Sequence, residues 1–373
     1  MALRSLPAVY MRGGTSKAIF FDRRDLPALE TGDMSAWNEI FCAALGSPDP
    51  YRRQLNGMGG GITSLSKVAI VGPPTHADAD VDYTFAQVDV TAPVVGYRGN
   101  CGNISSAVGP YAVDRGLVKV AGETADVVIH NTNTGKLIRA RFALEDGQPA
   151  VEGAMLLDGV AGHGSPIELA FLDPAGAATG QLFPTGNRTD VLELTGLAVE
   201  GASMVDVCNP VIFLRADALG LAGKETPDQM AANPALLALF EDVRVAAAKA
   251  MGMVASENEA RTTLRNLPLV CLVSETRLEE AAHVEVRMIS SGQPHKATPL
   301  TGAMCVAAAA AIPGTLVNAV SRRIENGAPI RIAHASGLIE VSARGQFVHD
   351  NPSIAEAIVY RTARKLMEGR VFF

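Results

Sequence analysis

Three glycine-rich segments in the first 110 residues combine small polar side chains with a backbone that a ligand can approach closely. They are residues 11–17 (MRGGTSK), 55–61 (LNGMGGG) and 99–103 (GNCGN). Glycine allows successive N–H groups to converge on one point, and such a cradle binds carboxylates and oxyanions. Each segment alone is typical of a tight turn between strands. Three of them in one half of the chain, flanked by Arg, Lys, Ser and Asn, favour an anion-binding site.

Cys101, in the third segment, is the strongest candidate for a reactive thiol. It lies just before residues 104–115, a small-residue stretch that predicts a helix. A thiol at a helix N-terminus faces unpaired N–H groups and the positive end of the helix dipole, which can activate it. A free cysteine is more often a small buried apolar residue. That second interpretation fits the other four, which lie in apolar segments: Cys42, Cys208, Cys271 and Cys305.

Lys67 is a candidate base. It follows the hydroxyl-rich residues 63–66 (TSLS) and precedes residues 68–71, which predict a strand. A lysine at the mouth of a cleft can lose its proton when it is desolvated, whereas a lysine at a strand end is usually solvated. Arg12 and Lys17 have the same two interpretations, as an anion clamp or as ordinary surface charge.

Motifs for metals and organic cofactors are missing from the sequence. The five cysteines form no C-x-x-C pair, the seven histidines form no H-E-x-x-H pair, and no phosphate loop or dinucleotide fingerprint occurs. Lone histidines such as His295 and His334 are more often structural than functional. The sequence therefore favours chemistry without a cofactor, although metal ligands brought together by folding stay open.

Composition limits the class of protein. The 373 residues are 48% hydrophobic and 5% aromatic and carry a net charge of −7, which predicts two or three globular domains and no nucleic-acid surface. The longest apolar stretch, residues 303–312, ends at Pro313 and is too short to span a bilayer. The first residues lack the apolar core of a secretory signal. We expect a soluble, cytoplasmic protein without nucleic-acid or membrane partners.

Hydrophobic patterns place these residues on a mixture of strands and helices. Strands are predicted over residues 8–11, 18–21, 68–71, 81–90, 127–130 and 137–142. Helices are predicted over residues 37–45, 104–115, 234–251, 302–312 and 353–368. Because the two kinds of element do not alternate strictly, the pattern favours an α+β fold over a doubly wound sheet.

The two halves of the chain look like distant copies. A strand, a polar turn and a small-residue helix occur in this order over residues 81–113 and again over residues 283–312. Four pairs of landmarks have sequence offsets between 193 and 202. The alignment places Thr301 at the position of Cys101. The boundary is predicted in the turn-rich residues 184–188.

Residues 10–17 (YMRGGTSK) resemble the opening signature of the PrpF-like family. The resemblance covers nearly the whole chain and includes residues 46–50, 56–60, 64–67, 100–103, 183–187, 312–315, 334–337 and 366–369. It implies a fold like that of diaminopimelate epimerase, with two similar α+β halves at residues 1–187 and 188–373. Each half would be a curled sheet around a central helix, with the active site between them. The helix predicted at the C-terminus would pack back on the first half.

The family includes methylitaconate and methylaconitate isomerases and 4-oxalomesaconate tautomerase. The resemblance therefore implies an isomerase that shifts a C=C bond in a small unsaturated di- or tricarboxylate without a cofactor. In that scheme Lys67 removes the allylic proton, and Cys101 donates a proton or steadies the dienolate. The residues implied to bind the substrate are Arg12, Ser16, Asn56, Gly59, Gly60, Ser64, Gly102 and Asn103, with His295, Thr301, Gly302 and Ser336 from the second half.

Two alternatives stay open at this stage. Epimerases of this fold use one cysteine from each half, and Thr301 is too weak an acid to replace the second thiol. An epimerase would therefore need Cys305 in that role. The other alternative is a non-catalytic accessory protein of an aconitase-like dehydratase. The sequence does not distinguish methylitaconate, methylaconitate, aconitate and 4-oxalomesaconate as substrates, and it leaves open whether the chain forms a homodimer.

Overall fold

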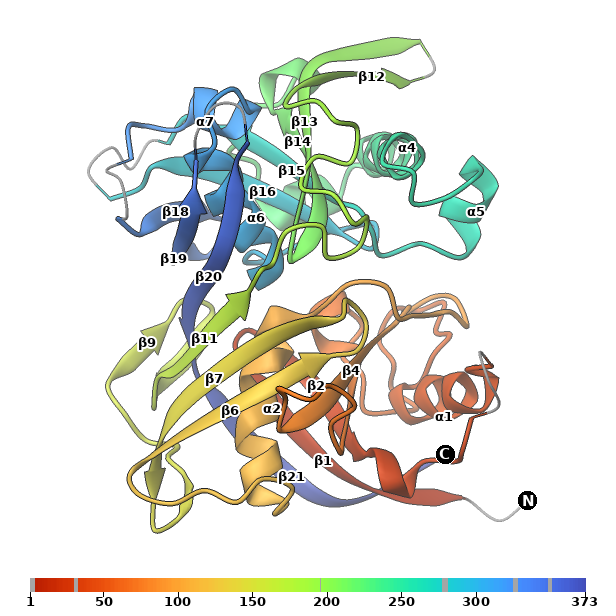
Figure 1. Ribbon diagram of the computed structural model, residues 1–373. Coiled ribbons are helices and arrows are strands. Elements are labelled where there is room, and N and C mark those ends of the chain that lie inside the picture. Colours follow the sequence, from red (N-terminus) through yellow and green to blue (C-terminus); the bar gives the residue numbers. More distant parts are fainter. Residues whose placement is uncertain (1–3, 30–32, 195, 277–280, 325–327, 348–350) are drawn as a thin grey trace. The chain divides into compact units, whose positions relative to one another are not determined.

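The computed structural model describes residues 4–29, 33–194, 196–276, 281–324, 328–347 and 351–373 (Figure 1). The chain folds into two compact units. The first contains the chain up to Tyr97, Cys101–Leu169 and Tyr360–Phe373, and the second contains Arg98–Asn100 and Ala170–Val359. The chain changes unit within β11 (Ile167–Leu172) and again within β20 (Ser353–Arg361). The C-terminal residues 360–373 therefore belong to the same unit as the N-terminal ones.

The first unit is built on one mixed sheet around a buried helix. Its paired strands, in spatial order, are β21 (Ala363–Phe372), β1 (Ser5–Gly13), β2 (Ser16–Asp22), β3 (Lys67–Gly72), β4 (Val81–Val88), β6 (Thr124–Asn131) and β7 (Lys136–Glu145). Figure 1 shows α2 (Gly102–Asp114) against these strands, and it contacts all seven of them. Its small residues permit this close packing, since a Cβ on Gly109 would lie 2.8 Å from the Phe142 ring.

Shorter elements complete the first unit. The helix α1 (Ser35–Leu45) packs Trp37 and Phe41 into a core that includes Phe21, whose ring stacks on that of Phe41. The remaining elements are the 3-10 turns η1 (Arg23–Asp25) and η2 (Thr63–Leu65), and the strands β5 (Val95–Gly96), β8 (Gln148–Pro149), β9 (Met155–Leu157) and β10 (Val160–Gly164).

The second unit has a sheet of the same kind. Its strands, in spatial order, are β12 (Asp190–Leu194), β13 (Leu197–Val207), β14 (Asn209–Arg215), β15 (Leu269–Ser274), β16 (Val284–Ser290), β18 (Ile330–His334), β19 (Gly337–Gln346) and β20. The buried helix α6 (Leu300–Ala311) packs against β13, β14, β18 and β19. Around it lie η3 (Asp217–Leu219), α3 (Pro227–Ala231), α4 (Pro234–Ala250), α5 (Glu257–Thr262), β17 (Gln293–Pro294) and α7 (Leu316–Val320).

The pairing of the strands confirms the predicted duplication. In the first unit β1, β2, β3, β4, β6 and β7 pair successively as antiparallel, parallel, antiparallel, parallel and antiparallel neighbours. In the second unit β13, β14, β15, β16, β18 and β19 repeat that series. Each series includes one buried helix, α2 or α6, after a short strand. The α+β expectation is therefore correct, and so are the six predicted strands.

The two buried helices begin in the same way. Cys101 is the N-cap of α2, and its carbonyl accepts the N–H of Ser105. Pro299 is the N-cap of α6, and its carbonyl accepts the N–H of Ala303. Thr301, which the sequence alignment pairs with Cys101, is the second residue of α6. Cys101 and Thr301 therefore both lie at the start of the buried helix of their unit.

The helix predicted over residues 353–368 is wrong, because these residues form β20 and most of β21. The strand β20 shifts register against β19 between the pairs Arg344–Glu356 and Gly345–Ile354. This bulge gives β20 an extra residue and buries both Ile354 and Ala357. A spacing of three between buried residues imitates the period of a helix, which explains the error.

Candidate active site

Lys67 is the centre of the polar cluster in the first unit. It begins β3 and is buried, with 8% of its surface exposed. Its Nζ donates a 2.5 Å hydrogen bond to Oε1 of Gln87, which lies directly opposite it on β4. The same nitrogen lies 5.0 Å from the centre of the Phe85 ring. The amine is therefore held by one neutral acceptor and one aromatic face.

The amide of Gln87 can present only its oxygen to Lys67. Its Nε2 donates to the carbonyls of Ser66, at 2.8 Å, and Thr63, at 3.2 Å. These two bonds show which end of the amide is the nitrogen and which is the oxygen. The shape of the side chain alone does not distinguish them. Gln87 was missed by the sequence analysis, although a glutamine between the apolar residues Ala86 and Val88 of β4 was a signal that could have identified it.

Cys101 lies beside the same amine. Its side chain is 9% exposed at the N-cap of α2, and its thiol is within hydrogen-bonding reach of Lys67. The Cys101 carbonyl also accepts the Ser105 hydroxyl at 3.1 Å, which fixes the first turn of the helix. The structure therefore brings together Lys67 and Cys101, the two residues predicted to carry the chemistry.

Burial lowers the pKa of Lys67 below its ordinary value of 10.5, while the charge of Cys101 and its hydrogen bond oppose that effect. Desolvation disfavours an ammonium ion, and its effect on the pKa exceeds the opposing effect of Cys101. A lysine with a lowered pKa has a larger neutral fraction at physiological pH and can accept a proton.

A second cluster surrounds Asn103, the second residue of α2. Its Nδ2 donates to Thr15 Oγ1 at 3.1 Å, and its Oδ1 accepts from Arg361 Nε at 3.2 Å. A Cβ on Gly14 would lie 2.2 Å from that Oδ1, and Gly14 has φ +50. Only glycine fits there, which accounts for the glycine pair in the first segment. Ser16 and Gly102 are also buried.

Arg12 connects the first hairpin to the C-terminal strands. Its Nη1 donates to the carbonyl of Gly14 at 3.0 Å and to Thr362, at 2.9 Å to the carbonyl and 3.0 Å to Oγ1. Burial, and to a smaller extent the charge of Arg364, lower the pKa of Arg12. The Nη1 atom of Arg12 is thus used in hydrogen bonds within the protein. The predicted role of Arg12 as an anion clamp would therefore depend on its Nε and Nη2 atoms.

The second glycine-rich segment contributes less than expected. Asn56 and Gly60 are exposed, and Ser64 lies half-buried in η2. The Gly59 N–H donates to the carbonyl of Leu45 at 3.2 Å, so it does not fit the predicted contact with a carboxylate. A Cβ on Gly59 would also lie 2.2 Å from the Gln54 side chain. Close packing, rather than ligand binding, accounts for this glycine.

In the second unit, Asn209 clamps the first turn of α6 to residues 98–100. Its Nδ2 donates to Thr301 Oγ1 and to the Asn100 carbonyl, both at 2.8 Å. Its Oδ1 accepts the Asn100 N–H at 2.8 Å. Asn209 is 6% exposed and was missed by the sequence analysis, because no motif marks a single asparagine at the start of a strand.

The other predicted residues of the second unit lie around the segment that leads into α6. The Nδ1 of half-buried His295 accepts the Ala297 N–H at 3.1 Å. The hydroxyl of exposed Ser336 donates to the carbonyl of Lys296. A Cβ on Gly302 would lie 2.8 Å from the Met288 methyl group, so packing explains this glycine.

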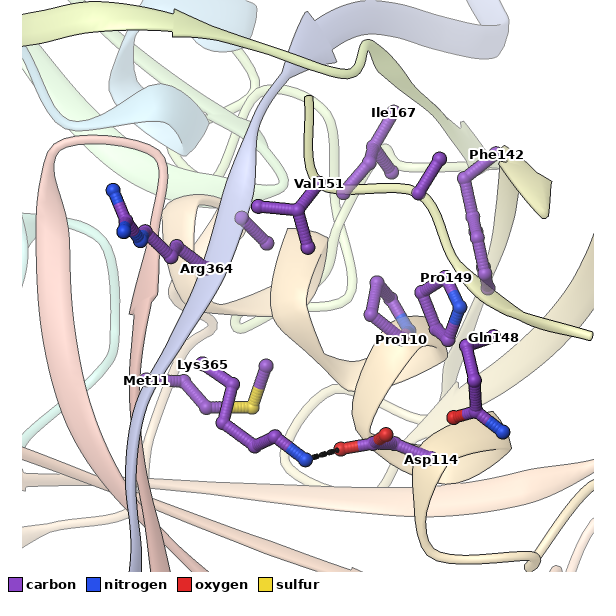
Figure 2. Close-up of a pocket in the computed structure, with 12 residues that line it drawn as sticks. Met11, Pro110, Asp114, Phe142, Gln148, Pro149, Val151, Ile167, Arg364 and Lys365 are labelled. Carbon is purple, nitrogen blue, oxygen red and sulfur yellow. Dashed lines mark hydrogen bonds and ion pairs between the residues drawn. The ribbon is translucent and has the colours of Figure 1, made fainter. Parts of the chain in front are cut away.

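A hydrophobic pocket of about 200 Å³ lies along the later turns of α2 (Figure 2). Its lining includes Pro110, Phe142 and Ile167, and the ion pair between Lys365 and Asp114, at 2.5 Å, lies on one side. Neither Lys67 nor Cys101 lines it. The pocket is therefore separate from the polar cluster at the start of the helix.

Within the described residues, the structure has neither a metal-binding cluster nor a membrane-spanning helix. No group of three or more His, Cys, Asp or Glu side chains there is arranged to hold a metal ion. In the same ranges, no helix has the length and apolar character needed to cross a membrane.

Comparisons with known proteins agree with this architecture. Several relatives match along almost their full lengths, and two of them serve as examples. The chain is 42% identical to a 3-methylitaconate isomerase of Eubacterium barkeri, covering 98% of this chain and 97% of the relative. It is 38% identical to a 2-methyl-aconitate isomerase of Cupriavidus necator, covering 98% and 96%.

Solved structures give the same result for the fold. A crystal structure of methylitaconate-delta-isomerase is 40% identical, with a TM-score of 0.75 over 100% of this chain and 96% of that one. A hydroxyproline epimerase of Agrobacterium vitis is only 12% identical but has a TM-score of 0.58 over 99% and 93%, which confirms the epimerase-like fold. The sequence model described as "PrpF protein" matches residues 3–373, and the chain belongs to the PrpF family.

Proposed function

We propose that the chain is an isomerase that shifts a C=C bond in a small unsaturated di- or tricarboxylate, with Lys67 as the base. The observation that carries this proposal is the buried Lys67 amine, held by the neutral amide of Gln87 beside Cys101. The names of the relatives support the same reaction, since both are isomerases of unsaturated acids. The chain is accordingly a C=C isomerase, and its particular substrate within this class stays a prediction.

The reaction needs one proton to leave and one to return. The neutral Lys67 amine takes a proton from the allylic carbon, and the electrons of that C–H bond delocalise through the double bond onto the adjacent carboxylate. A proton from the Cys101 thiol or from the Lys67 ammonium is then added at the other end of the allyl system. The double bond moves by one position without a change in oxidation state.

The first turn of α2 would stabilise the dienolate. The N-terminus of a helix carries unpaired N–H groups and partial positive charge, and both favour an anion. Fixed donors aimed at developing charge lower the barrier because they need no reorganisation. Gly102 and Asn103 are the first residues of α2, so the base and the anion site lie at the same helix end.

The epimerase alternative has weaker support. It requires Cys305 as a second thiol, but this side chain is fully buried and its Sγ donates to the Val205 carbonyl at 3.3 Å. Burial raises the pKa of Cys305 well above its ordinary value, which disfavours the thiolate. Pro299, the N-cap residue of α6, and Thr301 in its first turn carry no thiol. The alternative of a non-catalytic accessory protein does not explain why the Lys67 amine is buried beside a thiol.

An ultraviolet assay tests the proposal. Methylitaconate, methylaconitate, aconitate and 4-oxalomesaconate are offered to the wild type and to Lys67→Met, which keeps the length and apolar packing of the side chain. We expect at least one acid to react, and the variant to lose at least about 10²-fold in turnover, because a positioned base contributes that much. Lys119→Met, which removes an exposed lysine of the first unit, is the matched control and should keep full turnover. Equal turnover in Lys67→Met and the control would reject Lys67 as the base.

A further inference from the structure

Arg361, the last residue of β20, is a buried cation next to the candidate site. It is 5% exposed. Its Nε donates to Asn103 Oδ1 at 3.2 Å, and its Nη1 donates to the Tyr360 carbonyl at 2.8 Å. Both acceptors are neutral. The structure gives Nη2 no hydrogen-bond partner among the residues it describes.

No carboxylate in the described part of the chain forms an ion pair with Arg361. Burial alone lowers the pKa of Arg361 to about 10, so the guanidinium stays charged at neutral pH. An unpaired charge inside a protein is strongly unfavourable, and buried charges are normally paired or bind a ligand of opposite sign. A counter-ion for Arg361 would offset the cost of burying its charge, and the described residues do not provide one.

The surroundings of Arg361 favour an anion. Asn103 lies in the first turn of α2, two residues after Cys101, where the dipole of the helix is positive. A Cβ on Gly14 would lie 3.1 Å from Arg361 Cδ, so the glycine loop comes close to the arginine. Three independent features thus meet at one place: a helix N-terminus, a glycine loop and an uncompensated guanidinium.

We propose that Arg361 is the counter-ion of one substrate carboxylate and donates to it through Nη2. This proposal rests on the proposed function and assigns to Arg361 the anion-binding role that the sequence analysis considered for Arg12. Neutralising that carboxylate makes the neighbouring allylic proton more acidic, because the dienolate then carries less uncompensated charge. A planar guanidinium suits a carboxylate, which it can bind through two parallel hydrogen bonds.

A series of saturated acids separates this role from a structural one. Calorimetry measures the binding of tricarballylate, glutarate and butyrate, which carry three, two and one carboxylates and cannot isomerise. We expect Arg361→Met to bind tricarballylate about 10- to 100-fold more weakly than the wild type, the usual loss for a hydrogen bond between charged groups. The loss should be smaller for butyrate. Arg361→Lys keeps the charge and should lose less than Arg361→Met.

Arg364→Met is the matched control, because it removes an exposed arginine three residues further along the chain (labelled in Figure 2). It should bind all three acids as the wild type does. If Arg364→Met lost as much affinity as Arg361→Met, the effect would come from the net charge of the protein, and the proposal would be overturned. So would unchanged affinity in Arg361→Met, or a wild type that binds none of the acids.

A structural role for Arg361, limited to orienting Asn103, gives a different result. Without ligand, Arg361→Met would then melt at a lower temperature than the wild type. Its affinity for each of the three acids would fall by the same factor, and this result would overturn the proposal. A wild type that binds tricarballylate through Arg361 but isomerises no acid of the panel would reject the proposed function alone. Normal turnover and KM in Arg361→Met would reject the role of Arg361 as a counter-ion and would leave the proposed function intact.

Discussion

Lys67 and Gln87 lie directly opposite each other on the antiparallel strands β3 and β4, and the lysine amine donates to the glutamine oxygen at 2.5 Å. A carboxylate in this position would stabilise the ammonium ion, whereas a neutral amide does so only weakly. The choice of Gln rather than Glu at residue 87 therefore keeps the neutral amine accessible.

Gln87→Glu should raise the pKa of Lys67, because it places a negative charge beside the amine. Turnover at neutral pH should fall about 10-fold for each unit of that rise, and should recover as the pH increases. The measurement is kcat/KM between pH 6 and 10. Gln87→Met, which adds no charge, is the control and should not move the profile to higher pH. A Gln87→Glu profile that coincides with the wild type would contradict the assignment of Lys67.

The wild-type enzyme should become faster as the pH rises through the pKa of Lys67. The reason is that the base works only as the neutral amine, and burial lowers the pKa of this group below 10.5. The midpoint of the rise in kcat/KM should therefore lie below that value. A rate that falls with rising pH over the same interval would show that the essential form of the group is protonated.

Cys101→Ser separates two roles of the thiol, since a hydroxyl can donate a hydrogen bond but is a poor proton donor. The loss should be smaller than in Lys67→Met if Cys101 only steadies the dienolate, and comparable if it delivers the proton. Turnover of both variants in deuterated water, with the product examined by NMR, measures this. Near-normal turnover in Lys67→Met together with an inactive Cys101→Ser would instead make the thiolate the base.

Exhaustive treatment with a chelator should leave turnover unchanged, because Lys67 and Cys101 supply both proton transfers and the helix N-terminus supplies positive potential. The test is dialysis against EDTA followed by the ultraviolet assay. Loss of activity that a divalent metal restores would require a different mechanism.

Asn209→Ala should destabilise the second unit. The substitution removes three hydrogen bonds, two with the backbone of Asn100 and one with the Thr301 hydroxyl, and each hydrogen bond contributes about 0.5–1.5 kcal/mol to stability. We expect the free energy of unfolding in urea to fall by about 2 kcal/mol. Asn266→Ala removes one bond to the Arg98 carbonyl at a more exposed place and should cost about 1 kcal/mol or less. Equal effects of the two variants would reject the clamp.

Local patterns were sufficient for much of the fold. The small-residue runs that form α2 and α6 and the apolar runs that form β3 and β4 are continuous in sequence, so periodicity identified them. Lys67 and Cys101 were identified because each stands beside a motif. The repeat was detectable because both units keep the same order of elements, with a polar turn before the buried helix in each.

The missed residues depend on contacts between distant parts of the chain. Arg361 reaches Asn103 across 258 positions, and no local pattern predicts such a contact. Asn209 meets Asn100 across 109 positions and carries no motif. The bulge in β20 changed the spacing of its buried residues and concealed a strand. In each case the pairing of the sheet, which depends on the whole chain, decided the outcome.

The pairing of β21 with β1 has a consequence for synthesis on the ribosome. The register runs from Ser5 opposite Phe372 to Gly13 opposite Ala363, and Figure 1 shows the blue strand beside the red one. The first unit therefore cannot finish its sheet until the entire second unit has been translated. Meanwhile β1 has an unpaired edge that other chains could join. Because Arg361 arrives with the same late segment, a nascent chain that lacks residues 360–373 should stay sensitive to protease and bind no tricarballylate.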